Sequence, residues 1–206
     1  MELSLNIRCA LAQLAGKLSK YIIKLGRGMG KSFPGYIYLK IGKKECVSKL
    51  TSNLDVGSIL ITGTNGKTTT TKIIALLLGN DTDIIYNYES NTINAIITSL
   101  LDGNADLGVF EYGIRDIKHA IPDTVSRIIG PAGVVYTNVS REHSQIGGVK
   151  NPFEKYLKAK QLLSQPMKKG IVISNADDPR TAYIGKSKEE DVGVSYYGLD
   201  IDMEDK

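Results

Sequence analysis

The sequence is poor in the features that membrane insertion and metal clusters require. No apolar run approaches the roughly 20 residues that a membrane-spanning helix needs, and the first residues lack the apolar core of a signal peptide. Cysteine occurs only at Cys9 and Cys46, without the spacing of metal ligands. We therefore expect a cytoplasmic protein with two free thiols. Periodic repeats and low-complexity segments are also missing.

Positive charge is concentrated at the start of the chain. The first 45 of the 206 residues carry a net charge of +7, whereas the whole chain carries +4, which leaves −3 for residues 46–206. The apolar content of 42% is ordinary for a globular protein, and the length suits one sizeable α/β domain with a small appendage. We expect a basic N-terminal segment over residues 1–55, made of a helix with a turn or strand, and a main domain over residues 56–206.

The N-terminal segment contains an amphipathic helix pattern. A glycine-rich stretch at residues 26–30 would end this helix, and residues 33–35 would form a turn. Such a helix can lie on an anionic membrane surface. More often it packs its apolar stripe on the next domain and leaves its lysines in water, which is the arrangement we expect. The apolar face holds Leu11, Leu14, Leu18, Ile22 and Leu25, and the other face holds Lys17, Lys20 and Lys24.

From residue 56 onward, apolar strand-like runs alternate with helical patterns. The runs are continuous, which is typical of strands buried on both faces of a parallel sheet. We predict an α/β fold with a mainly parallel sheet and helices on both faces, and ligands bind such sheets at the carboxyl ends of the strands. Strands are expected at 58–62, 83–87, 107–111, 133–138, 170–174 and 192–197, and helices near 67–78, 91–102, 115–127 and 151–165.

The most informative stretch is Ile-Thr-Gly-Thr-Asn-Gly-Lys-Thr-Thr-Thr-Thr, residues 61–71, between an apolar strand and an apolar helix pattern. A glycine-rich turn that leads into a helix binds phosphate, because backbone N–H groups point at the anion and the helix dipole favours negative charge. Lys67 would reach the terminal phosphates, and the Thr68 hydroxyl would bind Mg²⁺. The turn is a variant P-loop, since Ile61 stands where the general pattern has a glycine. A helix start without a ligand is the alternative, although a lysine in a glycine turn has little structural use. The other phosphate-binding candidates are Gly63, Thr64, Asn65, Gly66 and Thr69.

Four polar residues later in the chain are further candidates for the site, and each is a weak signal when taken alone. Glu111 closes the strand at 107–111, where an acidic residue beside a P-loop orients Mg²⁺ or its water; the alternative is a carboxylate that merely faces solvent. Asn138 ends the next strand. His143 follows it, where a histidine is more often a hydrogen-bonded loop residue than a ligand. Lys160 lies on a helix, where a lysine is usually solvated.

Taken in order, these motifs resemble the central ATPase domain of the Mur ligase family. The resemblance covers about residues 56–185. It consists of the Thr-Gly-Thr-Asn-Gly-Lys-Thr-Thr loop at 62–69, the strand-end Glu111, Asn138 followed by Glu142-His143, Ala159-Lys160, and Asn-Ala-Asp-Asp at 175–178.

The resemblance implies a specific chemistry. Members of this family form amide bonds with ATP: a substrate carboxylate attacks the γ-phosphate, and an amine then displaces phosphate from the acyl phosphate. It implies that Asn138 and the loop hold the nucleotide, and that Thr68 binds one Mg²⁺. Glu111, His143 and a carbamylated Lys160 match the ligands of the second Mg²⁺. Carbamylation needs a neutral amine, so the pKa of Lys160 must be lowered by its surroundings.

Features outside these motifs narrow the branch. The segment at 15–35 and the stretch at 89–101 are similar to MurT, the ligase subunit of lipid II isoglutaminyl synthase, and to the archaeal pseudomurein peptide ligases. Tyr112-Gly113 follows Glu111 where MurT sequences have an acidic pair, and MurT sequences tend to carry Gln in place of His143. Glu142-His143-Ser-Gln145 also departs from the common Asp-His-x-Asp pattern. These departures favour the pseudomurein type.

The implied function is an ATP-dependent ligase of cell-wall peptide synthesis, of pseudomurein or peptidoglycan. Its partners would be a nucleotide- or lipid-linked peptide precursor and an amine donor. A MurT-like protein would also have a glutamine amidotransferase as a partner. We expect no binding of nucleic acid. The family's adenine-contacting stretch, the zinc insert of MurT and the amine-presenting C-terminal domain are missing, so we expect an incomplete ligase. The alternative is a non-catalytic nucleotide-binding module that regulates partner binding through the basic helix.

Overall fold

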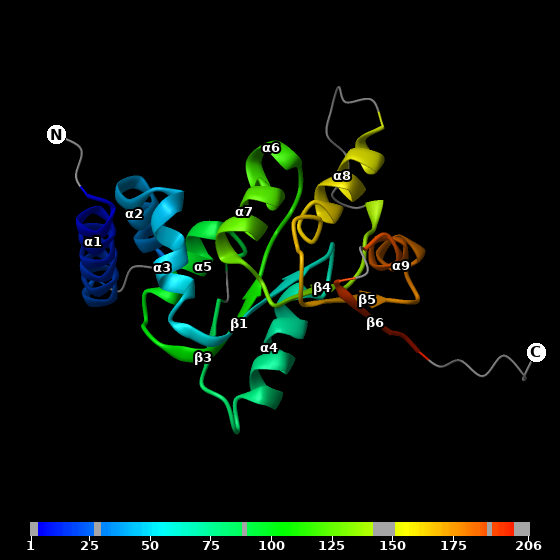
Figure 1. The fold of residues 1–206 in the computed structure, drawn as a ribbon, viewed down its shortest axis with the longest axis horizontal. Coiled ribbons are helices and arrows are strands. Elements are labelled where there is room, and N and C mark those ends of the chain that lie inside the picture. Colours follow the sequence, from blue (N-terminus) through cyan, green and yellow to red (C-terminus); the bar gives the residue numbers. More distant parts are fainter. Residues whose placement is uncertain (1–3, 27–29, 88–89, 142–150, 189–190, 200–206) are drawn as a thin grey trace, which may run out of the picture.

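The computed structural model describes residues 4–26, 30–87, 90–141, 151–188 and 191–199 (Figure 1). Its centre is a six-stranded sheet in the order β2-β3-β1-β4-β5-β6, and every neighbouring pair of strands is parallel. The predicted strands and the parallel sheet are confirmed. The strands are β1 (Leu54–Thr62), β2 (Ile84–Tyr86), β3 (Ala105–Glu111), β4 (Gly133–Tyr136), β5 (Ile171–Asn175) and β6 (Gly193–Tyr197).

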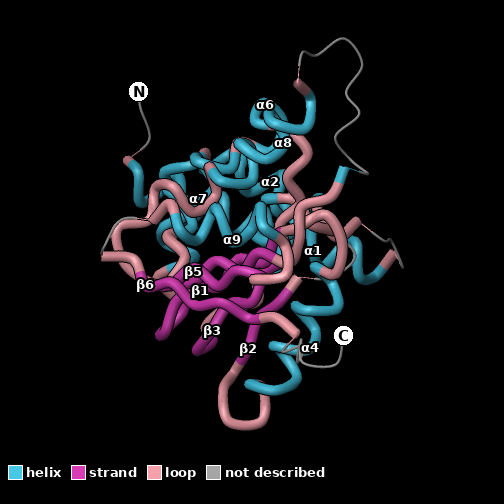
Figure 2. The backbone as a smooth tube through the Cα atoms, turned by 90° about the vertical axis from the view of Figure 1, so that its right-hand side faces the viewer, coloured by secondary structure: helices cyan, strands magenta, loops and turns pink. Residues whose placement is uncertain are grey.

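Helices cover both faces of the sheet. Figure 2 shows α4 on one side of the strands and most of the other helices on the opposite side. The face towards α4 buries Ile61, Leu107, Val109 and Val135, whereas the opposite face belongs to a larger core that extends into the N-terminal helices. Because Leu60 and Ile61 are buried on opposite faces, the C-terminal half of β1 is a continuous apolar run. The covering helices include α4 (Lys67–Leu78), α5 (Ile93–Leu100), α8 (Pro152–Gln161) and α9 (Pro179–Lys186).

Several predicted bounds need correction: β1 begins at Leu54 rather than at residue 58, and α8 ends at Gln161 rather than at residue 165. The helix expected at 115–127 is divided into α6 (Ile117–Ala120) and α7 (Pro122–Ile129), because Pro122 cannot continue the hydrogen bonding of α6 and begins a new helix. Ile121 between them has a φ of 43°, an unusual conformation for a β-branched residue. Helix α9 was not predicted from the sequence, since it is short and begins at Pro179.

The described part of the segment before the sheet consists of helices joined by short turns, and the turn predicted at residues 33–35 is instead helical. Residues 33–35 form the first turn of α2, because proline is well suited to the start of a helix. Gly35 then allows α2 to approach α5, since a Cβ at this position would lie 1.9 Å from the Asn94 carbonyl oxygen. The elements are α1 (Leu5–Leu25), α2 (Phe33–Gly42), the 3-10 turn η1 (Lys44–Cys46) and α3 (Val47–Thr51).

The apolar stripe of α1 does not pack on the main domain, so this prediction was wrong. Helix α1 instead buries a face of small residues, Cys9, Ala12 and Gly16. A Cβ on Gly16 would lie 2.8 Å from a methyl group of Leu101, so small residues permit the close approach. The larger apolar side chains at positions 11, 14, 18, 22 and 25 are 47–67% exposed. Within the described ranges, every helix is too short or too polar to traverse a bilayer.

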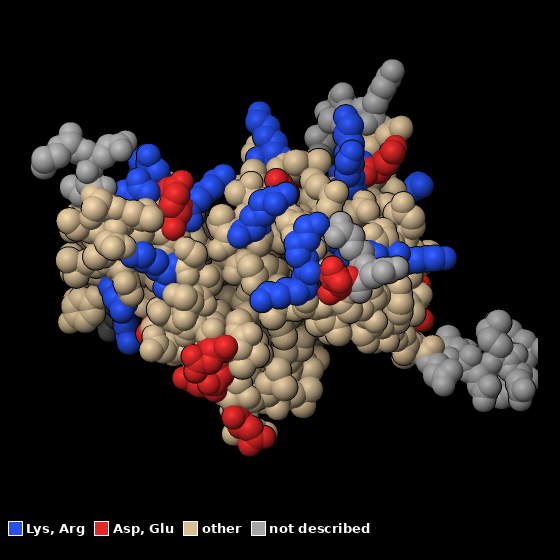
Figure 3. All heavy atoms as spheres, viewed as in Figure 1, with Lys and Arg blue, Asp and Glu red and all other residues tan. Residues whose placement is uncertain are grey.

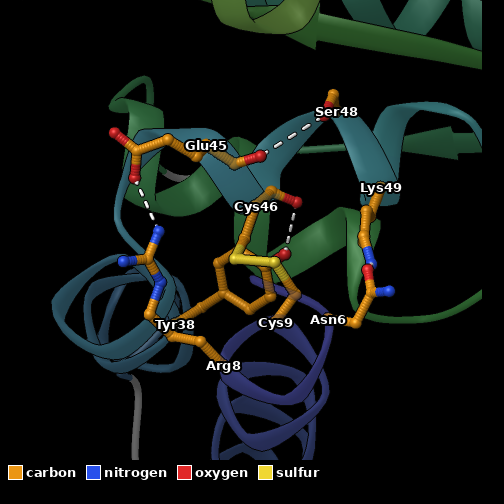
Figure 4. The surroundings of a disulfide bond; sticks show 8 residues. All are labelled: Asn6, Arg8, Cys9, Tyr38, Glu45, Cys46, Ser48 and Lys49. Atoms are coloured by element: carbon orange, nitrogen blue, oxygen red, sulfur yellow. Dashed lines mark hydrogen bonds and ion pairs between the residues drawn. A yellow bond between two sulfur atoms is a disulfide. The ribbon is translucent and has the colours of Figure 1, made fainter. Parts of the chain in front are cut away.

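The two cysteines are joined, which corrects the prediction of free thiols. Packing of α1 beside η1 brings the Cα atoms of Cys9 and Cys46 to 5.2 Å, within the range that a disulfide requires. Figure 4 shows the bond beside the ring of Tyr38, whose hydroxyl donates to the Cys46 carbonyl oxygen at 2.7 Å. A separation of 37 residues gave no sequence signal for this pairing.

Candidate nucleotide-binding site

The turn between β1 and α4 depends on two glycines. Gly66 has a φ of 81° and caps the N-terminus of α4, a conformation that glycine adopts without strain. At Gly63, a Cβ would lie 1.8 Å from the Thr137 hydroxyl oxygen. The turn therefore lies directly against the end of β4. It places the N-terminus of a 12-residue helix at the carboxyl end of the sheet, where helix geometry favours an anion.

The segment after β4 holds this turn by several hydrogen bonds. The backbone N–H of Thr64 donates to the Asn138 carbonyl oxygen (2.8 Å), and that of Asn65 donates to Asn138 Oδ1 (3.0 Å). Asn138 Nδ2 and Thr137 Oγ1 both donate to the Asn65 carbonyl oxygen, at 3.2 and 2.7 Å. Asn138, predicted as a nucleotide contact, thus sets the shape of the phosphate-binding turn.

The Asn-Ala-Asp-Asp motif supports the same segment from β5. Asn175 Nδ2 donates to the Thr137 carbonyl oxygen at 3.0 Å. Asp178 Oδ2 accepts from the backbone N–H of Val139 at 2.5 Å, and Asp178 also caps α9. The motif therefore connects β5 and α9 to the loop that holds the phosphate-binding turn.

Thr68 and Glu111 lie side by side at the start of α4. The Thr68 hydroxyl donates to Glu111 Oε2 at 2.5 Å, and Glu111 is only 3% exposed. The alternative of a carboxylate that merely faces solvent does not fit this burial. The contact arises because β3 pairs with β1, so that the end of β3 lies beside the turn. The pair presents two oxygen atoms, the kind of ligand that Mg²⁺ prefers.

Asn87 positions Glu111 and was not predicted from the sequence. Its side chain accepts from the Glu111 N–H (2.8 Å) and donates to the Glu111 carbonyl oxygen (3.0 Å). Asn87 directly follows β2, which pairs with β3. A polar residue at the end of the predicted strand 83–87 was the available signal.

Lys67 is folded back over the turn. Its Nζ donates to the carbonyl oxygens of Gly63 (3.1 Å) and Thr64 (3.0 Å). Burial lowers the pKa of Lys67 from its ordinary value, with Glu111 opposing the shift and Arg115 adding to it. The Lys67 ammonium group therefore lies within the turn, close to both Glu111 and Arg115.

Lys160 is fully buried, in contrast to the solvated lysine that the helix pattern alone would suggest. Its Nζ lies 4.6 Å from the ring centroid of Tyr156 and 3.4 Å from the Ile114 carbonyl oxygen. Burial, and then the nearby charge of Lys67, lower its pKa to about 7. A substantial fraction of the amine is therefore neutral at physiological pH.

A cavity of about 650 Å³ opens beside Lys67, within the size range of ligand sites. It was not predicted, because its walls come from four separate segments. Arg115 and His119 supply polar groups, and Asp116 holds the His119 ring through Nδ1 at 2.9 Å. Tyr156 links the cavity to the turn, since its hydroxyl lies 3.0 Å from Thr64 Oγ1. The lining includes Gly63, Lys67, Asn91, Tyr112, Arg115, His119 and Tyr156.

His143, a predicted metal ligand, lies outside the described residues. Among the residues that are described, no three His, Cys, Asp or Glu side chains form a cluster that could hold a metal ion. The predicted Mg²⁺ ligands within the described part are Thr68, Glu111 and Lys160. The first two are in contact. Lys160 lies close enough to Lys67 for that charge to lower its pKa.

Known proteins are similar to this chain in both sequence and fold. MurT, a subunit of the glutamine-hydrolysing lipid II isoglutaminyl synthase of Staphylococcus aureus, is 29% identical over 191 residues, which cover 92% of this chain and 40% of MurT. The chain thus spans about two fifths of the length of this relative.

Two solved structures have the same fold. MurF from Thermotoga maritima in complex with ADP has a TM-score of 0.63 at 19% identity, covering 77% of this chain and 36% of MurF. A type C pseudomurein peptide ligase from Methanothermus fervidus has a TM-score of 0.56 at 24% identity, covering 77% and 31%. The Mur ligase middle domain matches residues 61–205. This chain belongs to the Mur ligase middle domain family.

Proposed function

We propose that the protein is the ATP-binding part of a ligase that joins the carboxylate of a cell-wall peptide precursor to an amine. The observation that carries this proposal is the contact between Thr68 and Glu111 at the N-terminus of α4, with Lys67 in the same turn. A phosphate-binding turn with an adjacent buried carboxylate suits a Mg²⁺-bound nucleotide. The family match and the MurT relative support the reaction type.

Each residue of the turn has a defined role in this proposal. The N-terminus of α4 and Lys67 hold the β- and γ-phosphates, so Lys67 must leave the carbonyl oxygens of Gly63 and Thr64 when the nucleotide binds. Thr68 would hold the Mg²⁺ that neutralises the negative charge of the phosphates, and Glu111 beside it would hold a second Mg²⁺. Asn138 keeps the turn in its phosphate-binding shape through its bonds to residues 64 and 65.

The cavity beside Lys67 is the proposed site of the acceptor. The substrate carboxylate attacks the γ-phosphorus, the bond to the bridging oxygen breaks, and ADP leaves. The amine then attacks the acyl carbon, the bond from that carbon to the phosphate oxygen breaks, and the proton lost by the amine leaves with the phosphate. Arg115 and His119 line the cavity and can bind a carboxylate of the peptide. Two anions approach each other in the first step, so positive charge at Lys67 and Arg115 lowers its barrier.

Lys160 is proposed to react with CO₂. The neutral amine attacks the carbon of CO₂ and loses a proton, which gives a carbamate with one negative charge. Support comes from its burial and its pKa of about 7. As ammonium groups, Lys160 and Lys67 repel each other, whereas a carbamate and Lys67 attract. With Glu111 and His143, the carbamate would complete the oxygen and nitrogen ligands of a second Mg²⁺.

The identity of the amine separates two branches. The match to MurT, which covers 92% of the chain, supports ammonia as the amine, released from glutamine by a partner subunit. Tyr112-Gly113 after Glu111 and histidine at position 143 favour the pseudomurein type, in which an amino acid would be the amine.

The test uses the full-length protein with ATP, Mg²⁺ and candidate wall peptides, followed by mass analysis of the products. A peptide that gains the mass of an amide, with one ADP released per bond, supports the proposal. Incorporation of ¹⁵N from labelled glutamine, in the presence of an amidotransferase subunit, identifies the MurT type, and an added amino acid identifies the pseudomurein type. Nucleotide binding without any amide product would instead support a non-catalytic module.

A further inference from the structure

The apolar stripe of α1 faces away from the rest of the molecule. Each of its side chains is 47–67% exposed, and the buried face of Cys9, Ala12 and Gly16 lies on the opposite side of the helix. At 1.5 Å per residue, the stripe extends about 27 Å along the helix. A monomeric protein rarely leaves so continuous an apolar strip in water. We define the stripe as Ile7, Leu11, Leu14, Leu18, Ile22 and Leu25.

The charges of α1 indicate what covers this stripe. The helix contains four basic residues and neither Asp nor Glu. Arg8 pairs with Glu45, and Lys20 pairs with Asp102. Lys17 and Lys24 are exposed, and the helical repeat places them along one border of the stripe. Figure 3 shows basic side chains beside an uncharged surface at the end of the molecule where α1 lies.

We propose that α1 lies on an anionic lipid surface, with the stripe in the boundary between headgroups and acyl chains. The stripe would bury its leucine and isoleucine side chains among the lipids, while Lys17 and Lys24 would extend towards the lipid phosphates. Both contributions are needed, because each apolar side chain inserts only partly and each lysine adds only a modest attraction. This inference does not depend on the nucleotide site.

A second exposed apolar group on the molecule has the opposite electrostatic setting. Leu76 and Leu77 near the end of α4 are 74% and 72% exposed. Asp81 and Asp83 follow in the next loop, and the last turn of α4 contains no basic residue. With two aspartates against one exposed lysine, Lys72 on α4, this surface attracts an anionic bilayer less than α1 does. It therefore provides a control with the same kind of side chain and similar exposure.

The test is flotation with lipid vesicles of phosphatidylcholine alone or mixed with phosphatidylglycerol. The protein is expected to bind the mixed vesicles, to bind pure phosphatidylcholine at least about tenfold more weakly, and to dissociate as salt rises. The double variants L14Q/L18Q and K17Q/K24Q are each expected to lower binding to mixed vesicles by at least about tenfold. The variant L76Q/L77Q is expected to bind as the unchanged protein does.

Three outcomes would overturn the proposal. The first is absence of binding to the mixed vesicles by a protein that melts cooperatively, and the second is an equal loss of binding in L76Q/L77Q. The third is a dimer in light scattering that L14Q/L18Q dissociates while vesicle binding stays unchanged, because a second copy of the chain would then cover the stripe. All the substituted side chains are exposed, so the variants are expected to keep the melting temperature of the unchanged protein.

Discussion

The hydroxyl of Thr68 donates a hydrogen bond to Oε2 of Glu111, although 43 positions separate the two residues. The contact exists because β1 and β3 are parallel neighbours that end at the same edge of the sheet. It places a neutral and a charged oxygen together at the N-terminus of α4.

Substitution of Glu111 by glutamine tests whether this pair binds Mg²⁺. Glutamine keeps the size of the side chain and can still accept from Thr68, but it removes the negative charge. We expect E111Q to weaken Mg²⁺-dependent ATP binding by at least about tenfold, the loss typical of one charge-assisted interaction. Calorimetric titration with ATP, with and without Mg²⁺, measures it. Equal Mg²⁺ dependence in E111Q and the unchanged protein would exclude Glu111 as a ligand.

Lys67→Ala is expected to abolish measurable nucleotide binding, because the substitution removes the cation that would contact the terminal phosphates. The same titration measures the loss. Lys72→Ala is the matched control, since Lys72 lies on α4 and is exposed. If both variants lose the same affinity, Lys67 contributes only through the overall charge of the helix.

Lys160 is expected to make stability depend on pH. Its pKa of about 7 lies below the ordinary 10.5, so between these values the unfolded chain binds a proton that the folded chain lacks. Stability should therefore rise with pH in this window, by up to about 1.4 kcal/mol per pH unit. Below pH 7 both states bind the proton, so the free energy of unfolding should stay at its lower value. Urea unfolding at several pH values, without CO₂ or Mg²⁺, measures the slope.

Two variants of α8 identify the source of this slope. Lys160→Met replaces the buried amine by an apolar side chain and should flatten the dependence, whereas Lys158→Met, at an exposed position of the same helix, should leave it unchanged. A slope that persists in Lys160→Met would assign the titration to another group.

Carbamylation of Lys160 predicts a ¹³C signal from labelled CO₂ that disappears in Lys160→Ala. In the full-length enzyme, short-chain carboxylic acids should restore activity to that variant.

The sequence predicted the parts of the fold that depend on local patterns. The central strands β3 and β4 are almost continuously buried because helices cover the sheet on both sides there, and the phosphate-binding turn has its glycines at positions that only glycine can occupy. Glu111 and Lys160 could be chosen from the family resemblance. The contact of Glu111 with Thr68 follows from strand order, which spacing alone does not give.

What the sequence did not predict depends on contacts between distant segments. Helix α1 was expected to bury its leucines. It buries Cys9, Ala12 and Gly16 instead, because the neighbouring elements pack so closely that only small residues fit at the contact. The Cys9–Cys46 bond follows from that same packing. Asn87 and Tyr156 reach the site only because neighbouring strands and α8 bring them there.

The Cys9–Cys46 disulfide is expected to stabilise the N-terminal helices. Closing a loop of this length contributes about 3–4 kcal/mol in the chain-entropy account. Addition of a reductant should lower the free energy of unfolding by that amount, as measured with urea. The variant C9A/C46A should show the lower stability without reductant and no further response to it. A response to reductant that remains in the double variant would show that it has another origin.

Asn87 is expected to act on Mg²⁺ binding through the position of Glu111. In Asn87→Ala, the buried N–H and carbonyl groups of Glu111 lose their partners, which should cost about 1–3 kcal/mol of stability for each unsatisfied group. Glu111 should then lose its fixed orientation towards Thr68. We expect weaker Mg²⁺-dependent ATP binding, with Mg²⁺-free binding nearly unchanged because Lys67 and the turn remain.

The Asn87→Ala experiment needs a control that separates position from stability. Asn80→Ala removes an exposed asparagine in the loop after α4 and should change neither quantity. Lowering the temperature to restore the folded fraction of Asn87→Ala should not restore its Mg²⁺ dependence, since the carboxylate would still lack its backbone support. If Mg²⁺ dependence returns together with stability, Asn87 supports the fold alone, and the orientation of Glu111 is fixed by its own strand.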